Sequence, residues 1–443
     1  MHITLQEMLD ARESRALVQG RMLKAHNAPL ICFTMNIAGP VKTSPIVERA
    51  FREGVRLINE KLVGHEVIER REEHTKCGPV LFCSLRANAD KIKTAMIDIE
   101  ENHPLGRLFD IDVIADDGRK TTRPTERGCI VCGAPGRACA AGRLHPVSEI
   151  TSVMDKIMTD YFTDLDAKCI AQIAKESLLR EVYTTPKPGL VDMNNNGSHT
   201  DMTVADFERS AEALEPYFYE CFRLGATHKD QASEKHFPLL REEGIKAEKM
   251  MYAATNGANT HKGAIFSMGI IAGAVGRLTS TYGALPTTDD ILTEAANIFR
   301  PHIERDLESL DGSTAGGRAY LDHGERGIRG EVADGFPSIV NFALPAYKKA
   351  LAEGKNENDA GVITLLELIA NVYDTNLYKR GGDDGLRYAQ ERAKELIGSG
   401  SALENVRLLD DDFIDRRLSP GGCADLLAVT YFLVRTENEK YNS

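Results

Sequence analysis

The feature that most constrains the fold is a change of sequence pattern near residue 165. Before this point, apolar runs of strand length alternate with segments in which apolar residues recur at helical spacing. After it, strand signals nearly vanish and helical spacing dominates. A chain of 443 residues also exceeds what one hydrophobic core usually organises. The sequence therefore predicts two domains, an α+β domain over residues 1–163 and an all-helical, multi-helix domain over residues 166–443.

The individual elements follow from the same periodicity. In the first part we expect helices at 3–23, 44–62 and 90–101 and strands at 30–37, 79–85 and 108–114. In the second part we expect helices at 167–183, 204–224, 262–278, 289–310, 338–352, 362–374, 385–396 and 422–435. The boundary is expected near residues 162–166, where a helix over 154–162 ends and Thr163-Asp164-Leu165-Asp166 caps the next helix.

Composition indicates a globular protein that stays in the cytoplasm. The first residues carry neither a basic start nor an apolar run, so no secretory signal is expected. The longest apolar run, at 264–276, is too short and too rich in glycine to span a bilayer, and we expect a buried helix there. Nine cysteines in such a chain are expected to stay reduced and to be buried or bound to metal.

Charge is distributed unevenly along the chain. Residues 1–165 hold 23 basic and 23 acidic residues, whereas the remainder holds 31 and 43 and carries the whole net charge of −12. This acidic balance disfavours general nucleic-acid binding. Within the neutral part, one segment has a single acid, Glu126, among the basic residues Arg119, Lys120, Arg123, Arg127, Arg137 and Arg143. Such a segment attracts a polyphosphate or an acidic protein, although a solvated arginine surface gives the same pattern.

Two carboxylates in the first part are candidates for metal binding. Asp110 and Asp112 lie two residues apart in the predicted strand at 108–114, so both side chains face one side of the sheet. Two acids on one face can hold Mg²⁺, which would bridge phosphate oxygens and support attack on phosphorus. The same spacing also arises by chance at strand ends.

A second metal pattern follows at Cys129, Cys132, Cys139 and His145. Three thiolates and an imidazole can close a tetrahedral Zn²⁺ site, and the first cysteine pair has a spacing typical of zinc ligands. The remaining spacings are unusual, and arginines interleave with the cysteines. The segment therefore fits either a zinc site or a phosphate-binding loop with buried cysteines.

The second part contains two polar segments that we expect to belong to one site. The first, at 186–202, is irregular and holds Lys187, Asp192, His199 and Asp201. The second, at 259–266, places His261 and Lys262 in front of an apolar helix, where two cations serve no packing purpose. An alternative for Asp201, and for Asp425 further on, is that each acid only caps a helix, and the glycine pairs of this part also fit plain turns.

Several segments resemble two enzyme families. The segments 33–42, 106–113 and 129–145 resemble the apo-citrate lyase phosphoribosyl-dephospho-CoA transferase family, over roughly residues 1–163. The second part resembles the triphosphoribosyl-dephospho-CoA synthase family. The segments that carry this second resemblance are 186–202, 259–266, 327–331, 335–337, 374–376, 380–382 and 419–426. Separate motifs in family order make the chain similar to a natural fusion of the two families.

The resemblance implies that the second part joins ATP to 3′-dephospho-CoA with loss of adenine, giving 2′-(5″-triphosphoribosyl)-3′-dephospho-CoA. Such a reaction needs cationic groups for the triphosphate, a base for the attacking hydroxyl and a donor to the departing adenine. For catalysis we expect His199 and His261 on different walls of the pocket, with Asp192 and Asp201. The expected phosphate ligands are Lys187, Lys262, Arg329 and Arg380 and the amides of Gly381, Gly382, Gly421 and Gly422. The expected Mg²⁺ ligands are Asp334, Asp383 and Asp425.

For the first part, the resemblance implies a nucleotidyltransferase-like sheet and transfer of the phosphoribosyl-dephospho-CoA unit to a serine of the citrate lyase acyl carrier subunit, with pyrophosphate leaving. Asp110 and Asp112 would hold Mg²⁺, and Lys42, Arg107 and Arg127 would bind substrate. Two other classes of function compete with this interpretation. One is a single-activity nucleotidyltransferase whose helical part only regulates, and the other is a zinc-stabilised interaction protein that binds nucleotide without turnover.

Overall fold

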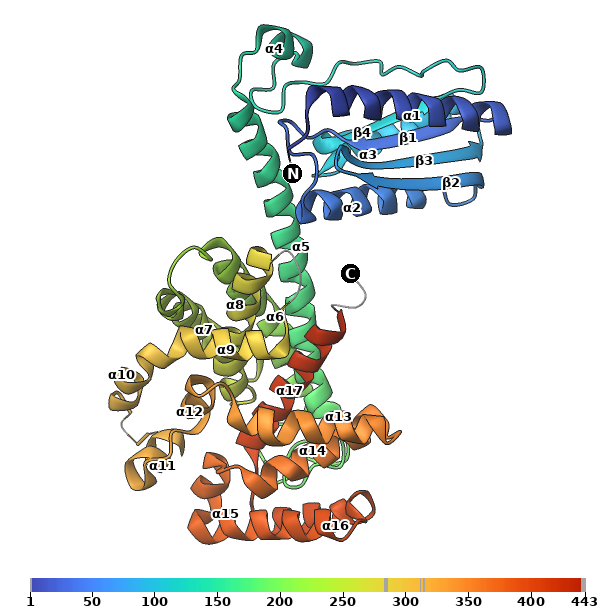
Figure 1. The fold of residues 1–443 in the computed structure, drawn as a ribbon. Coiled ribbons are helices and arrows are strands. Elements are labelled where there is room, and N and C mark those ends of the chain that lie inside the picture. The colour runs from blue at the N-terminus through green and yellow to red at the C-terminus, as the bar shows by residue number, and fades with distance from the viewer. Residues whose placement is uncertain (1, 283–285, 311, 314, 440–443) are drawn as a thin grey trace. The chain divides into compact units, whose positions relative to one another are not determined.

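A computed structural model describes residues 2–282, 286–310, 312–313 and 315–439, and it divides the chain into an N-terminal unit, Met1–Phe162, and a C-terminal unit, Thr163–Ser443 (Figure 1). The strands are β1 (Leu30–Met35), β2 (Glu66–Thr75), β3 (Gly78–Arg86) and β4 (Phe109–Ile114). The helices with residues in the N-terminal unit are α1 (Leu5–His26), α2 (Pro45–Lys61), α3 (Ala89–Asn102), α4 (Gly136–Gly142) and α5 (Val147–Tyr183), of which α5 continues into the C-terminal unit.

The remaining elements belong to the C-terminal unit. Its further helices are α6 (Val204–Thr227), α7 (His236–Ala254), α8 (Lys262–Tyr282), α9 (Thr288–Phe299), α10 (Ile303–Glu308), α11 (Ala315–His323), α12 (Gly327–Ala333), α13 (Leu344–Ala352), α14 (Glu357–Asn371), α15 (Thr375–Gly398), α16 (Ala402–Asp415) and α17 (Gly421–Glu439). Three 3₁₀ turns, η1 (Gly106–Leu108), η2 (Ser233–Lys235) and η3 (Arg300–His302), and one π-helical turn, η4 (Ile339–Ala343), complete the set in the described residues. The strands lie in the N-terminal unit, so the structure confirms an α+β first part and a helical second part.

The N-terminal unit is built on a four-stranded antiparallel sheet with the order β2-β3-β1-β4. Helices cover both faces. One face receives α1, whose Val18 and Met22 pack on Leu30 and Cys32 of β1. The opposite face packs against α2, α3 and the first part of α5 in a larger core. Since β4 is at an edge, its side chains and its outer backbone groups are open to loops from the same unit.

Strand β2 was missed in the sequence, and the reason is its composition. Its ten residues include many charged side chains and are almost all exposed or half-buried. It is an edge strand that pairs only with β3, so neither of its faces needs a continuous apolar set. The apolar alternation that identifies a half-buried strand is therefore absent from this segment.

The predicted break between two helices near residues 162–166 is wrong, because α5 runs without interruption through this point. Asp164, expected to cap a helix, instead pairs with Lys168 at 2.7 Å and accepts a hydrogen bond from the Tyr219 hydroxyl at 2.7 Å. The helix supplies Met158 and Phe162 to the core of the N-terminal unit, whereas its residues from 167 onward enter the core of the C-terminal unit. The change of partner therefore requires no break in the helix.

The centre of the C-terminal unit is α8, the apolar glycine-rich run of the sequence. Its Ile265, Met268 and Ile271 are at most 2% exposed. The glycines allow close contact with α6, since a Cβ built on Gly225 of α6 would overlap the carbonyl oxygen of Gly273. The prediction of a buried helix here is confirmed. No helix among the described residues is both long enough and apolar enough to cross a membrane.

The other helical predictions differ mainly at their ends. The expected helix at 289–310 is divided into α9 and α10 by η3, which contains Pro301. Helices α7, α11, α12 and α16 were not expected. Helix α15 spans two helical halves joined at a kink, where Gly382 has the non-helical φ of +61°, so the predicted helix at 385–396 corresponds to the second half and the half that begins at Thr375 was not expected.

Candidate active sites

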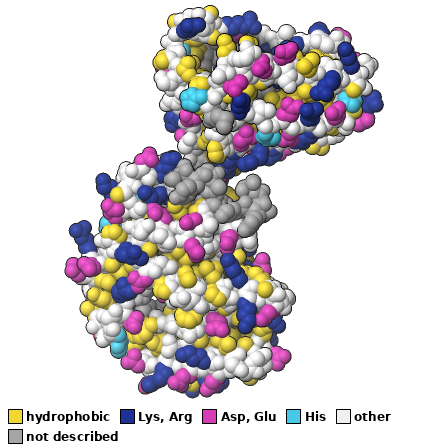
Figure 2. Space-filling view, in the orientation of Figure 1, with side chains coloured by type: hydrophobic (Ala, Val, Ile, Leu, Met, Phe, Trp, Pro, Cys, Tyr) yellow, Lys and Arg dark blue, Asp and Glu magenta, His cyan; other side chains and the backbone are white. Residues whose placement is uncertain are grey.

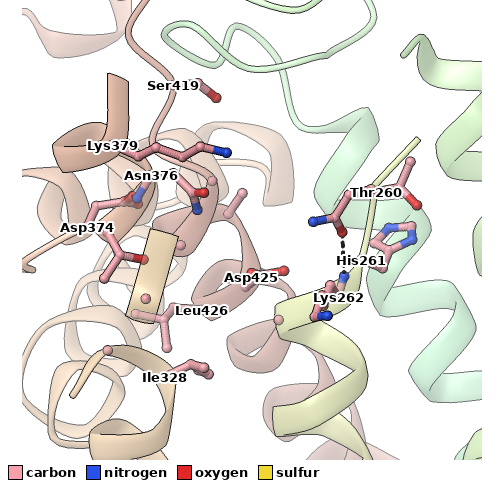
Figure 3. Close-up of a pocket in the computed structure, with 18 of the residues that line it drawn as sticks. Thr260, His261, Lys262, Ile328, Asp374, Asn376, Lys379, Ser419, Asp425 and Leu426 are labelled. Carbon is pink, nitrogen blue, oxygen red and sulfur yellow. Dashed lines mark hydrogen bonds between the residues drawn. The ribbon is translucent and has the colours of Figure 1, made fainter. Parts of the chain in front are cut away.

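The C-terminal unit encloses a cavity of about 880 Å³ that gathers most of the motif segments of this part. Figure 3 shows Asp374, Asn376 and Lys379 on one side and the 260–262 segment on the other, with Asp425 between them. These residues come from the starts of α15, α8 and α17, which are distant in sequence. The two polar segments of the sequence analysis, 186–202 and 259–266, therefore both contribute to one cavity.

Three helices begin at this cavity, namely α8, α15 and α17. The first amides of a helix have no partner within the helix and carry partial positive charge, so helix starts favour anions. Asp374 binds the first amides of two helices. At α15 its Oδ1 accepts hydrogen bonds from the amides of Asn376 and Leu377 at 2.7 and 3.0 Å, and at α17 its Oδ2 accepts a hydrogen bond from the Cys423 amide at 2.8 Å. Asp425 Oδ1 accepts from Ala264 N of α8 at 3.1 Å. The two acids hold the three helix starts together.

Burial controls the protonation of both acids. Burial raises the pKa of Asp425 well above its ordinary value, and the negative charges of Glu181 and Asp374 add to the shift. Burial also raises the pKa of Asp374, against the effect of its amide hydrogen bonds. Asp425 lies so close to α8 that residue 263 has to be glycine, since a Cβ there would overlap the carboxylate. The site thus holds a carboxylic acid that favours its protonated form.

His199 also lines the cavity and is held by two polar partners. Its Nε2 lies 2.8 Å from Ser419 Oγ, and its Nδ1 lies 3.3 Å from the guanidinium of Arg380. A guanidinium only donates, so Nδ1 accepts and the imidazole proton is on Nε2. Burial, followed by the charge of Arg380, lowers the pKa of His199. His199 is therefore a neutral side chain that orients Arg380 and Ser419.

His261 is 3% exposed and is held at one nitrogen only. Its Nδ1 lies 2.7 Å from the Ser210 hydroxyl, which in turn accepts a hydrogen bond from Thr260 Oγ1 at 2.8 Å. This arrangement directs the Ser210 proton to Nδ1 and leaves the imidazole proton on Nε2, an atom without a partner among the described residues. Burial, with a contribution from Lys187, lowers the pKa of His261 to about 3. His261 is thus neutral, and its Nε2 proton has no acceptor among the described residues.

The cationic side chains of the cavity differ in whether they already form an ion pair. Lys262 pairs with Glu248 at 2.8 Å, and Arg329 pairs with Asp306. Lys379 lines the cavity and has no hydrogen bond or ion pair within the described part of the chain. The sequence analysis did not single out this lysine, although it directly precedes Arg380. It is the cation most readily available to a phosphate.

The structure revises the roles of Lys187 and Asp192. Lys187 lines the cavity, but its ammonium forms an ion pair with Glu181, and the two side chains are 1% and 5% exposed. Asp192 lies outside the cavity lining. Its carboxylate accepts from Thr185 Oγ1 at 2.8 Å and from the amides of Lys187, Asn194 and Asn195 at 2.9, 2.7 and 3.1 Å. Asp192 shapes the loop, and its oxygens have no remaining capacity for substrate.

The predicted magnesium set Asp334, Asp383 and Asp425 is wrong as one site. Asp334 pairs with Arg326 and borders a different, smaller groove. The Asp383 side chain is 66% exposed near His323, and of the three only Asp425 lines the cavity. The glycine pair at 381–382 stands at the kink between the two helical halves of α15, where a helix was expected to open, but neither glycine lines the cavity, whereas Gly421 and Gly422 line it at the start of α17.

The sequence analysis missed Glu181, Asp374 and Glu331 as cavity acids. Burial raises the pKa of Glu331, whose carboxylate accepts from the Ser338 hydroxyl at 2.5 Å and from its amide at 3.2 Å. Asp374 stood in a motif but carried no assigned role.

In the N-terminal unit, Asp110 and Asp112 face the same side of β4, opposite Thr34 and Cys32 of β1. This confirms the predicted alternation along the strand. Asp112 pairs with Lys120 at 2.5 Å, whereas Asp110 has no hydrogen bond or ion pair among the described residues. Burial and the neighbouring charge of Asp112 raise the pKa of Asp110. Two close acids, one of them unpaired, are suited to a divalent cation that would offset their repulsion.

The outer edge of β4 is covered by side chains. The Ile111 carbonyl accepts from Lys93 Nζ at 2.7 Å, and the Ile111 amide donates to Glu100 at 2.9 Å. Arg127 donates to the carbonyls of Phe109 and Gly106, both at 2.7 Å. The backbone groups at this edge are therefore satisfied within the unit.

Several cationic side chains predicted to bind substrate instead donate hydrogen bonds to backbone carbonyls of the same unit. Besides Arg127, Arg107 donates to the Gly128 carbonyl, and Lys42 donates to the Ile37 carbonyl. Arg123 lies 3.3 Å from the buried Glu100. The expected cationic face at 119–143 is thus only partly on the surface, where the Arg137 side chain is 93% exposed. On the visible face of both units, basic and acidic side chains alternate (Figure 2).

The four residues of the predicted zinc pattern come together. One donor atom each from Cys129, Cys132, Cys139 and His145 lies within 4.8 Å of all the others. Cys139 is in α4, and His145 lies just before α5. In the described part of the chain, no other group of three or more cysteine, histidine or acidic side chains lies closely enough together to share a metal ion.

The structure places one charged site in each of two units, and comparison with known proteins shows that the chain is an enzyme of the transferase class. Residues 167–443 match the family model of ATP:dephospho-CoA triphosphoribosyl transferase, and residues 3–161 match that of apo-citrate lyase phosphoribosyl-dephospho-CoA transferase. The chain therefore belongs to the family in which these two transferases are fused, as the motifs predicted.

Full-length relatives share the fused arrangement. The chain is 33% identical to Protein CitXG of Leuconostoc mesenteroides subsp. cremoris, over 98% of this chain and 97% of the relative. It is 32% identical to Protein CitXG of Haemophilus influenzae, over 98% and 96% of the two chains. It is also 39% identical to the 2-(5''-triphosphoribosyl)-3'-dephosphocoenzyme-A synthase of Pectobacterium atrosepticum, over 65% of this chain and 96% of the relative.

Proposed function

We propose that this chain is a cytoplasmic bifunctional transferase that makes and attaches the prosthetic group of citrate lyase. Residues 166–443 would join ATP and 3′-dephospho-CoA to give 2′-(5″-triphosphoribosyl)-3′-dephospho-CoA and adenine. Residues 1–163 would transfer the phosphoribosyl-dephospho-CoA unit to a serine of the acyl carrier subunit of citrate lyase and release pyrophosphate. The family matches to the two parts support this assignment.

The observation that carries the first activity is the cavity of about 880 Å³ in the C-terminal unit. Its size matches that of pockets for nucleotide-sized ligands. The first amides of α17, at Gly421 and Gly422, together with Lys379 and Arg380, offer positive charge to a triphosphate. Neutral donors and a protonated acid lie in the same space, as departure of a purine requires.

The reaction transfers a ribosyl carbon. The 2′-hydroxyl oxygen of dephospho-CoA forms a bond to C1′ of the ATP ribose, while the bond from C1′ to adenine N9 breaks and its electron pair leaves with the base. The attacking hydroxyl gives up its proton, which we assign to Asp201, an exposed carboxylate at the cavity wall. Adenine takes a proton from Asp425, whose raised pKa keeps it protonated.

In this scheme the two histidines have roles other than acid and base. His199, whose nitrogens engage Arg380 and Ser419, positions the phosphate-binding arginine. His261 offers its Nε2 proton to an acceptor on the bound nucleotide. Both are neutral at pH 7 because burial lowers their pKa values.

The residues fit Mg²⁺ better in the N-terminal unit than in the cavity. The Asp374 oxygens already accept hydrogen bonds from three backbone amides, which leaves them little capacity for a metal ion. In the cavity, Mg²⁺ would therefore be held mainly by the triphosphate. In the N-terminal unit, Asp110 and Asp112 would hold Mg²⁺, which would supply positive charge to offset that of the leaving pyrophosphate. The pair lies on a nucleotidyltransferase-like sheet in this proposal, with the carrier serine approaching the same face.

The decisive experiment supplies the chain with ATP, dephospho-CoA, Mg²⁺ and the acyl carrier subunit. Intact-mass analysis should show one phosphoribosyl-dephospho-CoA unit added to the carrier serine, and chromatography should show free adenine. Adenine release without labelling would leave only the first activity. Labelling from ready-made triphosphoribosyl-dephospho-CoA without adenine release would leave only the second activity. The absence of both products would contradict the proposal.

Matched variants separate the assigned roles. Asp425→Asn should abolish adenine release, whereas Asp383→Asn, the same change on an exposed acid outside the cavity, should leave it intact. His261→Phe should raise the KM for ATP by at least tenfold through loss of one hydrogen bond, about 1.4 kcal/mol. Full activity of both Asp425→Asn and His261→Phe would remove these residues from the mechanism.

A further inference from the structure

The cluster formed by Cys129, Cys132, Cys139 and His145 has the geometry of a closed structural metal site. The Cys132 and Cys139 sulfurs lie 3.5 Å apart. In a tetrahedral site with Zn–S bonds of about 2.3 Å, two sulfurs are separated by about 3.8 Å. The four donor atoms, all within 4.8 Å of one another, are therefore close to the spacing that one Zn²⁺ ion imposes.

The backbone around the first two cysteines is folded as a tight turn around the cluster. Cys129 N donates to the Ala134 carbonyl at 2.6 Å, and Gly133 N donates to the Cys129 carbonyl at 2.9 Å. Gly133 has φ +75°, which a glycine adopts without strain. Val131 N lies 3.4 Å from Cys129 Sγ, so a backbone amide is available to stabilise a thiolate. The turn thus presents two sulfurs to the same point.

The histidine of the cluster is arranged as metal-ligating histidines are. His145 Nδ1 lies 3.2 Å from Glu149, which can accept its proton, whereas the buried Nε2 has no hydrogen-bond partner among the described residues. A carboxylate on one ring nitrogen fixes the tautomer and leaves the other nitrogen with a free lone pair for a metal. An unpartnered buried nitrogen beside three sulfurs is costly unless an ion binds there.

These contacts favour a metal over the phosphate-binding loop that the sequence left open. A phosphate needs convergent N–H donors or cations, yet the converging groups are three sulfurs and an imidazole lone pair. The nearby Arg137 side chain is 93% exposed. We propose that this cluster binds one structural Zn²⁺ through three thiolates and one imidazole, and that the ion fixes the 129–145 segment relative to β4.

The functional consequence rests on the proposed transfer activity. Between the cluster and β4 runs a short set of contacts, in which Arg107 binds the Gly128 carbonyl and Arg127 binds the carbonyls of Gly106 and Phe109. Phe109 directly precedes Asp110, the unpaired acid of the N-terminal site. Loss of Zn²⁺ would free the 129–145 segment and release these contacts, so carrier labelling should fall while adenine release by the C-terminal unit continues.

The first test measures metal directly and does not depend on activity. The full chain, purified with reductant and without added metal, should carry about one zinc per chain, with X-ray absorption showing about three sulfurs near 2.3 Å and one nitrogen near 2.0 Å. Cys132→Ser should lose the zinc. Cys77→Ser, the same change at a half-buried cysteine of the same unit outside the cluster, should keep it.

A second pair of variants covers the case in which Cys132→Ser does not fold. His145→Ala should lose the metal, whereas His145→Cys, which restores a four-thiolate tetrahedral set, should retain it. Chelation of the wild-type chain followed by Zn²⁺ return should remove and restore carrier labelling with little change in adenine release.

Three results would overturn the proposal. The first is that the reduced chain contains no zinc and shows no thiolate charge-transfer absorption when Co²⁺ is added. The second is an equal zinc content in Cys132→Ser and Cys77→Ser, and the third is a Cys132–Cys139 disulfide that persists in the native chain. If no preparation labels the carrier, the proposed function fails, but the zinc content still decides the metal site.

Discussion

The contact between Gly263 and Asp425 gives the sharpest test of how the C-terminal cavity is built. Gly263 is in the first turn of α8, and its Cα faces the buried carboxylate that also accepts the Ala264 amide. Replacing Gly263 with alanine adds one methyl group at this point. Alanine should otherwise favour the helix by about 0.5–1 kcal/mol, so any loss of stability reports the contact itself.

The size of the effect follows from the geometry. A Cβ on residue 263 would overlap the Asp425 Oδ2 and would lie 2.8 Å from the Asp425 Cγ. Ordinary contact between carbon atoms begins near about 3.5 Å, so the carbon pair alone requires the helix start and the carboxyl group to separate by about 0.7 Å, and the overlap with Oδ2 requires a larger shift. Overpacking of this kind costs about 1–3 kcal/mol of unfolding free energy. A displacement approaching 1 Å in a catalytic group also costs on the order of a hundredfold in rate.

The assay combines urea unfolding with adenine release. Gly263→Ala should lower both the unfolding free energy and the rate of adenine release, whereas carrier labelling from ready-made triphosphoribosyl-dephospho-CoA should stay near the wild-type value. Gly244→Ala, in the interior of α7, is the control, because its Cβ would meet only the Tyr217 hydroxyl at 3.5 Å. Wild-type stability and adenine release in Gly263→Ala would refute the reasoning.

Three further predictions concern charged side chains. Asp110→Asn should stop carrier labelling and leave adenine release unchanged when both products are measured in one reaction, since Asp110 belongs to the N-terminal unit; loss of both products would indicate a folding defect. Lys187→Met leaves Glu181 buried without its cation and should lower the unfolding free energy by about 3–5 kcal/mol, with much of the loss recovered in the double variant Lys187→Met/Glu181→Leu. Because the folded pKa of Asp425 is raised above its ordinary 3.8, its contribution to stability is present below that value and is lost as pH rises through the folded pKa. The wild type should therefore lose stability relative to Asp425→Asn as the pH of urea titrations is raised above the ordinary pKa of 3.8, and parallel curves would contradict the raised pKa.

Much of the fold follows from periodicity that neighbouring structure does not override. The helix at 44–62 was predicted because apolar residues recur at helical spacing, and in α2 these residues are buried, while Ser44 caps the helix and Pro45 is in its first turn. The sequence could not reveal β2, because its sheet position at an edge removes the need for apolar alternation. It also could not reveal that α5 is continuous, since threonine and aspartate at 163–166 are equally compatible with a helix interior when tertiary partners engage them.

The candidate sites were predictable where a motif brings its own chemistry. His261 and Lys262 stood out because two cations precede an apolar helical sequence, and Asp425 stood out because it lies in a motif that carries the family resemblance; all three line the cavity. Asp192 looked equally suitable, but its environment is decided by four hydrogen bonds within the loop that sequence alone does not display. Lys187 likewise could not be distinguished from a phosphate ligand, because its partner Glu181 lies in the preceding helix.

The covered edge of β4 has a consequence for how a protein substrate can approach. Many domains capture a peptide by letting it join the sheet as an extra strand, which requires free backbone groups at the rim. At β4 those groups are already bonded to Lys93, Glu100 and Arg127, and at the other rim β2 presents a row of charged side chains. A carrier serine would therefore have to arrive as the tip of a folded loop over the face that bears Asp110, so recognition would depend on the carrier's shape and surface charge, with no contribution from strand pairing.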